Sequence, residues 1–403
     1  MKRMETIRSE DMKEGMRFSA PVFFDDGKNM FLAEKKPITS FHLSVLSRWS
    51  IPYVVTYGKQ LGSDPVVEAE AEELEELEEL EPDTFSFSNI VRKKLTDVSS
   101  WKFYFKAIKN MQKFFADYKE NKPADKTLID DSIKLLYKLV TDDKNFALSC
   151  VFCKFEKNSF YPLAAVDTAV LSAVLARELD LPQRALIHCI SAAFLHSLEM
   201  FDYAALLSKL PSSAQKNAEL NINKNELLRT CLQKTVNFAA GMLMYPREVI
   251  TALSQRYEHW DGTGSPEGRK AQEIDQGARI LAVCSNFYST IAPEPAGQGM
   301  LAYDAVKKLL DEKDKKFDSG VLKAFVRAVG LYPPGTFVLL NDSSIAQVAS
   351  NNPDAPFVPS VQIIRASSPE DDKTGKLIDL NVEKSTLIVR AINPDEDKNI
   401  AKQ

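Results

Sequence analysis

Residues 258–268 read Glu-His-Trp-Asp-Gly-Thr-Gly-Ser-Pro-Glu-Gly, and the apolar run Gly-Ala-Arg-Ile-Leu-Ala-Val follows at 277–283. Three glycines and one proline fall within seven residues of this stretch, and such a sequence cannot continue a helix. The helical pattern of residues 249–260 is therefore expected to end here in a tight loop, and Asp275 is placed to cap the next helix.

Length and composition limit the class of protein. A chain of 403 residues suits two or three domains, because a domain usually holds roughly 100 to 200 residues. With 44% hydrophobic and 27% charged residues the composition is that of a globular soluble protein, and no apolar run approaches the ~20 residues that span a bilayer. The charged start of the chain does not resemble a secretory signal. We therefore expect a cytoplasmic protein without an integral membrane segment.

Charge and cysteine content exclude two further classes. A net charge of −5 argues against nucleic acid as a partner, because nucleic-acid-binding domains are usually strongly basic. Five cysteines are an odd number in a long chain, so they predict free buried thiols rather than a disulfide framework. The pair Cys150 and Cys153 lacks a second pair or a suitably spaced histidine, so it does not indicate a zinc site.

Two segments precede the helical part of the chain. The first predicts strands at 18–24, 29–33 and 53–57 and a short helix at 40–50. The second, residues 68–81, contains nine glutamates and no basic residue, so it is interpreted as a solvated linker, with an acidic partner-docking helix as the alternative.

Helical patterns occupy most of the remaining chain. Residues 89–145 predict two helices broken near 121–123, and the first places four lysines on one face and aromatic and apolar residues on the other. Such a face is usually a solvated surface over a packed core, although a basic stripe of this kind could also contact an anionic lipid or a nucleotide. Helices continue from 146 to about 329, and β-branched runs follow at 336–340, 346–349, 361–365 and 385–392.

The loop motif resembles the signature of the HD-GYP family, bacterial phosphodiesterases that linearise or hydrolyse cyclic di-GMP. That signature reads HHExxDGxGYPxG, and this chain keeps it at Glu258, Asp261, Gly262, Gly264, Pro266 and Gly268. The tract 330–338 resembles the C-terminal transition of the family, so the resemblance covers roughly residues 146–394.

The resemblance implies a mainly α protein: an HD-domain-type helical bundle with a small α+β N-terminal domain and a small β-rich C-terminal segment. The predicted boundaries are 1–62 for the N-terminal domain, 63–88 for the acidic linker, 89–145 for a helical connector, 146–334 for the HD-GYP-like domain, 335–395 for the β-rich extension and 396–403 for the tail.

Most metal ligands that the resemblance implies are absent. A two- or three-metal phosphodiesterase needs several imidazoles and carboxylates around the cations, and this chain has only His42, His188, His196 and His259. Only His196 and Glu258 survive as ligand-type residues. The other ligand positions are occupied by Ala164, Ser197, Asn237, Arg256, Tyr257 and Ser285, and Ser265 stands where the family has the tyrosine of GYP.

The surviving residues also have structural interpretations. His196 fits a hydrogen-bonded core histidine, and His259 fits a surface residue. Glu258 and Asp261 are expected to cap the loop or to pair with Arg256 or Arg279. His196, Glu258 and Asp261 are thus relic positions, with no bound metal and no cofactor expected. The candidates for nucleotide contact are Arg256, Asp261, Gly262, Gly264, Ser265 and Arg279.

The sequence therefore favours a protein without enzymatic activity: a degenerate HD-GYP protein acting as a signalling or scaffold module, with cyclic di-GMP as the candidate ligand, bound without hydrolysis. One alternative is a nucleotide-independent interaction module that uses residues 68–81 and the helical surface to hold an unknown signalling protein. Another is a residual metal-dependent phosphodiesterase with altered ligands. A homodimer through the helical domain is implied only by the resemblance.

Overall fold

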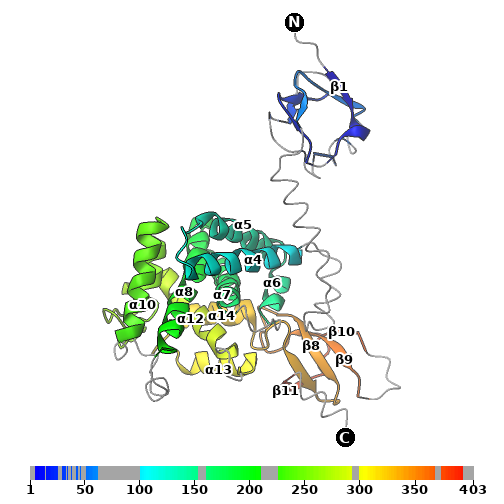
Figure 1. The fold of residues 1–403 in the computed structure, drawn as a ribbon. Helices are drawn as coiled ribbons and strands as arrows, with labels where there is room; N and C mark the ends of the chain where they lie inside the picture. Colours follow the sequence, from blue (N-terminus) through cyan, green and yellow to red (C-terminus); the bar gives the residue numbers. More distant parts are fainter. Residues whose placement is uncertain are drawn as a thin grey trace. The chain divides into compact units, whose positions relative to one another are not determined.

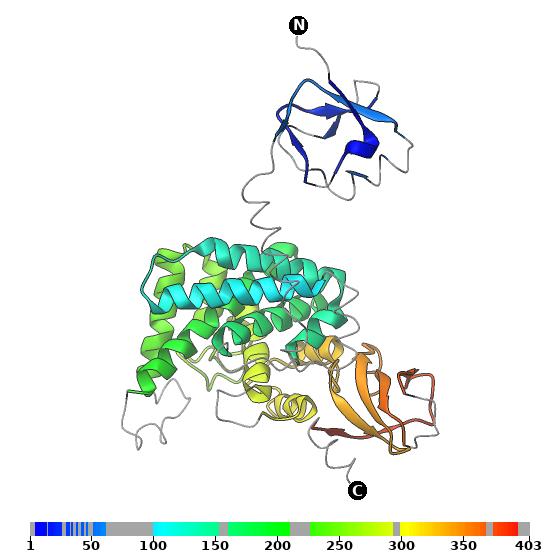
Figure 2. The same cartoon turned by 45° about the vertical axis from the view of Figure 1, so that its right-hand side comes forward.

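The computed structural model describes residues 5–61, 100–152, 160–209, 226–292, 299–367 and 374–393, with short gaps in the first range at 14, 26–29, 33, 35–37, 39–41, 44–45 and 47–50. The chain divides into two compact units, residues 1–84 and 85–403, which are treated separately (Figures 1 and 2). The acidic segment 68–81, the tail 396–403 and most of the expected helix 40–50 lie outside the described residues.

The N-terminal unit is a small antiparallel β structure. Its larger sheet has the strand order β1-β5-β3-β4, and β2 pairs separately with β6. The expected strand 18–24 is split in two, because Pro21 has no backbone N–H to donate to a continuous ladder. Phe18, Val22 and Val54 are among its buried core residues. The elements are β1 (Glu5–Arg8), η1 (Ser9–Asp11), β2 (Arg17–Phe18), β3 (Val22–Phe23), β4 (Met30–Leu32), β5 (Tyr53–Thr56) and β6 (Gln60–Leu61).

The second unit is mainly helical, as expected. It contains α4 (Ser100–Lys119), α5 (Lys126–Asp142), α6 (Lys144–Val151), α7 (Phe160–Glu178), α8 (Gln183–Leu207), α10 (Glu226–Asn237), the π-helix η4 (Phe238–Met242), α11 (Arg247–Ser254), η5 (Ala271–Glu273), α12 (Gln276–Ile291), α13 (Ala302–Asp311) and α14 (Ser319–Val329) (Figure 1).

Helix α7 forms the centre of this unit, packed against α4, α5, α6, α8, α12 and α14. It is apolar on all sides, which is the pattern of a fully enclosed helix. Within the described residues it is the one helix long and apolar enough to cross a bilayer, and 78% of its apolar window is buried by its neighbours. Its buried Asp167 accepts a hydrogen bond from Tyr104 of α4 at 2.5 Å, and burial raises the pKa of this carboxyl group well above its ordinary value.

Two helix boundaries differ from the expectation, and both concern the candidate site. The helix before the loop, α11, ends at Ser254 rather than near 260, because Gln255 turns the chain and its carbonyl accepts the Glu258 N–H at 2.9 Å. The apolar pattern of 166–179 predicts a helix that begins after Ala164, but α7 begins at Phe160, so Ala164 lies inside the helix. Pro162 is compatible with this earlier start because it falls in the first turn.

A five-stranded antiparallel sheet with the order β10-β9-β8-β7-β11 ends the chain. The elements are β7 (Phe337–Leu340), β8 (Ile345–Ser350), β9 (Ser360–Arg365), β10 (Leu377–Asp379) and β11 (Ile388–Ile392). The short edge strand β10 was not predicted, and β11 starts three residues later than expected because residues 383–385 form a turn closed by Glu383 and Ser385. The stacked rings of Tyr303 and Tyr332, 4.8 Å apart, link α13 to the segment that enters the sheet.

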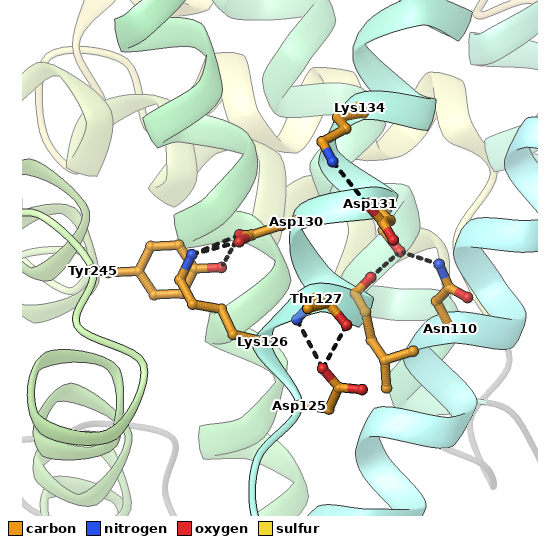
Figure 3. Close-up of polar contacts among 10 residues, drawn as sticks. Asn110, Asp125, Lys126, Thr127, Asp130, Asp131, Lys134 and Tyr245 are labelled. Carbon is orange, nitrogen blue, oxygen red and sulfur yellow. Dashed lines mark hydrogen bonds and ion pairs between the residues drawn. The ribbon is translucent and has the colours of Figure 1, made fainter. Parts of the chain in front are cut away.

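Helices α4 and α5 form an antiparallel pair. Tyr104, Ile108 and Met111 of α4 are buried, while Lys109 and Lys113 are exposed, as the helical spacing predicts. At the start of α5, Asp125 accepts hydrogen bonds from the N–H and hydroxyl groups of Thr127 at 3.0 and 2.5 Å (Figure 3).

The same end of α5 is tied to the segment before α11. Asp130 pairs with Lys126 at 2.7 Å and accepts a hydrogen bond from the Tyr245 hydroxyl group at 3.3 Å (Figure 3). Because Tyr245 immediately precedes Pro246 and α11, these contacts help to fix where α11 begins.

Asp125→Ala should lower the free energy of unfolding of the helical unit by about 1 kcal/mol, because an N-cap carboxylate is lost. Urea unfolding followed by circular dichroism measures the change. Asp131→Ala, an exposed residue of the same helix that pairs with Lys134, is the matched control and should cost less. Equal losses in the two variants would contradict the capping role.

Candidate functional site

The candidate site centres on the loop after α11, whose shape depends on Glu258. This side chain is only 3% exposed, and its two carboxylate oxygens accept the backbone N–H groups of Glu267 at 2.8 Å and Arg269 at 3.0 Å. Each oxygen therefore accepts one hydrogen bond that closes the loop. The capping interpretation of Glu258 is the one that the structure shows.

The glycines of the loop are required by its backbone. Gly262 and Gly268 have φ values of +85° and +68°, a region that residues with a side chain rarely adopt. A Cβ atom at Gly264 would lie 2.1 Å from the His259 nitrogen, so no other residue fits there. Asp261 caps the turn by accepting the Thr263 N–H at 2.9 Å and hydroxyl at 2.7 Å, and these bonds lower the pKa of its carboxyl group.

Backbone contacts with another turn of the second unit also hold the loop in place. The backbone N–H groups of Trp260 and Asp261 donate to the carbonyls of Lys316 at 3.1 Å and Lys315 at 2.9 Å, in the turn between α13 and α14. Asp275 caps α12, as predicted, by accepting the Gly277 N–H at 2.8 Å. The loop is thus a rigid structural feature held by backbone hydrogen bonds.

A buried ion pair lies beside the loop. The Arg256 Nη2 and Nε atoms lie 3.0 and 3.2 Å from Oε2 of Glu199 on α8, and the two side chains are 5% and 1% exposed. The Tyr257 hydroxyl donates to Glu199 Oε1 at 2.6 Å and accepts from Arg256 Nη2 at 2.5 Å. Burial opposes the charge on Arg256, but Glu199 and Tyr257 outweigh it and raise the pKa of the guanidinium group.

His196 lies one helical turn before Glu199 and is also buried. Its Nδ1 atom meets the carbonyl oxygen of Ala193, which fits the hydrogen-bonded core histidine expected from the sequence. Burial, followed by the nearby charge of Arg256, lowers the imidazole pKa to about 3. The ring is therefore neutral at physiological pH and faces a fixed cation.

The other positions that the resemblance marks as ligand sites carry no metal-binding chemistry. Ala164 is buried in α7, and Ser197 is buried with its Oγ atom 3.5 Å from His196 Nδ1. Asn237 is exposed at the end of α10 and bonds to Gln233 at 2.9 Å, away from the buried site. Ser285 is half-buried on α12.

The structure places the candidates for nucleotide contact in different environments. Arg256 is paired with Glu199, and Arg279 pairs with Asp318 at 2.7 Å, so both guanidinium groups already have a carboxylate partner. Ser265 is 3% exposed, whereas Asp261, Gly262 and Gly264 are half-buried in the loop. His259 is half-buried and bonds to Thr263 at 3.0 Å.

These residues do not fit a divalent metal. Each oxygen of Glu258 accepts a backbone hydrogen bond, and the charge of Arg256, which together with burial lowers the pKa of His196, would repel a second cation. Within the described ranges no three His, Cys, Asp or Glu side chains are grouped as a metal site.

Sequence reasoning missed the role of Glu199. It did not count this residue, which follows an apolar run of α8, among the candidates for the site. A glutamate in such a run is itself a signal, because a buried carboxylate almost always has a charged or hydrogen-bonding partner. The same helix carries a second such residue, Asp202, which pairs with Lys234 at 2.9 Å and accepts the Tyr118 hydroxyl at 2.6 Å.

The fold and the loop define the class of protein, a helical HD domain followed by a β domain. The HD domain family matches residues 128–321, and the family described as a KOW domain associated with the HD domain matches residues 337–400. The first match covers the helices that surround the loop, and the second covers the terminal sheet.

Two curated relatives are cyclic di-GMP phosphodiesterases. The chain is 23% identical to the cyclic di-GMP phosphodiesterase PdeB of Borreliella burgdorferi, over 91% of this chain and 86% of that protein. It is 24% identical to the cyclic di-GMP phosphodiesterase PA4108 of Pseudomonas aeruginosa, over 71% of this chain and 67% of that protein. A solved structure of an HD-GYP-type protein from Bdellovibrio bacteriovorus aligns with a TM-score of 0.44 at 14% identity, covering 80% and 98% of the two chains. The chain belongs to the HD-GYP family.

In His196→Asn the free energy of unfolding should fall less steeply with decreasing pH than in the wild type. The pKa of His196 is about 3 in the folded protein, below the ordinary value of 6.5. On acidification the unfolded state therefore binds a proton at this residue that the folded state does not bind. The wild-type protein therefore loses up to about 1.4 kcal/mol per pH unit from this group as pH falls below 6.5.

Urea unfolding at pH 7.5, 6.0 and 5.0 measures this slope in the wild type and in His196→Asn. His188→Asn, on the same helix and outside the site, is the matched control. If the His196 and His188 variants keep the same pH slope as the wild type, the buried neutral state of His196 is wrong.

Proposed function

We propose that this chain is a catalytically inactive HD-GYP protein that acts as a signalling or scaffold module. The proposal rests on one observation: both surviving ligand-type residues, Glu258 and His196, already interact with other groups of the chain. Glu258 uses both oxygens to close the loop, and His196 lies against a protein-borne cation. A hydrolytic metal centre needs these groups to point at a cation and at water instead.

Replacing metal ligands by arginine changes which chemistry is available. A guanidinium group supplies positive charge and hydrogen bonds, but it does not lower the pKa of a bound water as a metal ion does. In addition, the charge of Arg256 is balanced by the carboxylate of Glu199. The site therefore has no group positioned to generate a hydroxide nucleophile within the part of the chain that the structure describes.

Cyclic di-GMP is the ligand suggested by the names of the relatives, both cyclic di-GMP phosphodiesterases. A phosphate that contacts Arg256 or Arg279 would have to compete with the carboxylate that already partners each guanidinium group. Breaking such a pair is costly because it leaves a carboxylate uncompensated. This geometry favours a module that recognises a protein over one that holds the nucleotide through these arginines.

Metal analysis tests the loss of the catalytic centre. Protein purified and then incubated anaerobically with Fe²⁺ or Mn²⁺ should retain far less than one equivalent after desalting, and should not hydrolyse cyclic di-GMP above a protein-free blank. PdeB handled in parallel is the positive control. Stoichiometric metal together with turnover would instead establish the residual phosphodiesterase.

Isothermal titration tests the nucleotide. Cyclic di-GMP titrated into the full chain should give no binding heat up to high micromolar concentrations, because the candidate cations are already paired. A saturable isotherm would make the protein a cyclic di-GMP-binding module, and its loss in Arg279→Gln but not in Arg229→Gln, an arginine of α10, would locate the phosphate contact.

A further inference from the structure

The Glu199–Arg256 pair occupies the place that the resemblance gives to metal coordination. Arg256 and Tyr257 stand where the family signature has two histidines, and Glu199 lies on α8 one turn beyond His196. The charge of Arg256 contributes, after burial, to the lowered pKa of His196. Because Glu199 holds this guanidinium group at α8, the chain itself supplies a positive charge at this place.

The geometry of the pair is that of a satisfied internal salt bridge. Two nitrogens of Arg256 converge on one oxygen of Glu199, and Tyr257 donates to the other oxygen. Burial raises the pKa of Tyr257 well above its ordinary value, so its hydroxyl group stays protonated and remains a donor. Each member therefore depends on the other two, because a buried charge left alone is strongly unfavourable.

The pair connects elements that are far apart in sequence. Glu199 belongs to α8, whereas Arg256 and Tyr257 form the turn between α11 and the loop. The Tyr257 carbonyl accepts the Ser265 N–H at 3.0 Å, and the next residue, Glu258, holds the N–H groups of Glu267 and Arg269. Fixing residues 256 and 257 against α8 therefore also fixes the start of the loop.

We propose that Arg256, together with Glu199 and Tyr257, takes over the structural role that a metal ion would have. These three side chains clamp the loop to α8 without any bound cation. The stability that a metal ion adds to a fold depends on the free metal concentration, whereas a covalently attached cation is always present. The loop therefore keeps one conformation at any metal concentration, including the surface around the exposed residues Thr263, Pro266 and Glu267. This inference rests on the metal-free state proposed above and adds how the loop keeps its shape.

A double-mutant cycle in the full chain tests the clamp. Glu199→Met and Arg256→Met each leave one buried charge unpaired, and each should lower Tm by roughly 6–20 °C. The double variant replaces both charges by apolar side chains of similar length and should recover at least half of either loss. The exposed pair Lys134–Asp131 provides the control, and Lys134→Met should shift Tm by less than about 4 °C.

Hydrogen exchange links the clamp to the loop. The amides of Glu267 and Arg269 should exchange faster in either single variant than in the wild type or the double variant. Chelator should change neither Tm nor these exchange rates in the wild type. A double variant no more stable than the single variants overturns the clamp, and so does a wild type that chelator destabilises.

The two proposals fail separately in these assays. Hydrolysis of cyclic di-GMP by a protein with an intact double-mutant cycle and a chelator-insensitive Tm would remove the proposed inactive function and leave the clamp. Additive effects of the two substitutions in a metal-free protein would remove the clamp and leave the inactive function. If the single variants do not fold while the double variant does, the coupling is confirmed directly.

Discussion

The ion pair between Glu199 and Arg256 is the constraint on which the candidate site depends. Two charges with almost no solvent exposure are stable only when each satisfies the other, and here Tyr257 completes the set. The pair sets the distance between α8 and the turn after α11. Burial, followed by the guanidinium charge of the pair, lowers the pKa of His196 and keeps its imidazole neutral.

Local sequence patterns predicted the parts of the site that local chemistry controls. The spacing of Gly262, Gly264 and Gly268 predicted a tight loop, and the structure shows why each position needs glycine. Asp275 was recognised as a cap, and the apolar pattern of 166–179 predicted a helix that proved to be the centre of the second unit. These features depend on neighbours only a few residues away.

Features that depend on distant partners were not predictable in the same way. Arg256 was recognised as a cation at a ligand position, but its partner Glu199 lies 57 residues earlier, and no local pattern connects them. Arg279 likewise pairs with Asp318, 39 residues later. One local feature was missed as well: α11 ends early because the carbonyl of Gln255 accepts the N–H of Glu258 and turns the chain, which the apolar pattern of 249–260 does not reveal.

Membership of the HD-GYP family and the chemistry of this site are separate conclusions, because one fold supports both active and inactive members. The family is shown by the matches to the HD domain and its associated KOW domain and by the curated relatives. The proposed loss of activity rests on side chains instead. The backbone frame of the loop is retained, while its carboxylate, imidazole and guanidinium groups bind one another or the backbone.

The most direct measurement is a crystal structure of the full chain from crystals soaked in Mn²⁺, with anomalous diffraction data. We expect no anomalous peak between His196 and Glu258, with Arg256 and Glu199 still within hydrogen-bonding distance. A peak there, with His196 and Glu258 as ligands and Arg256 turned away from Glu199, would show that the site is a metal centre.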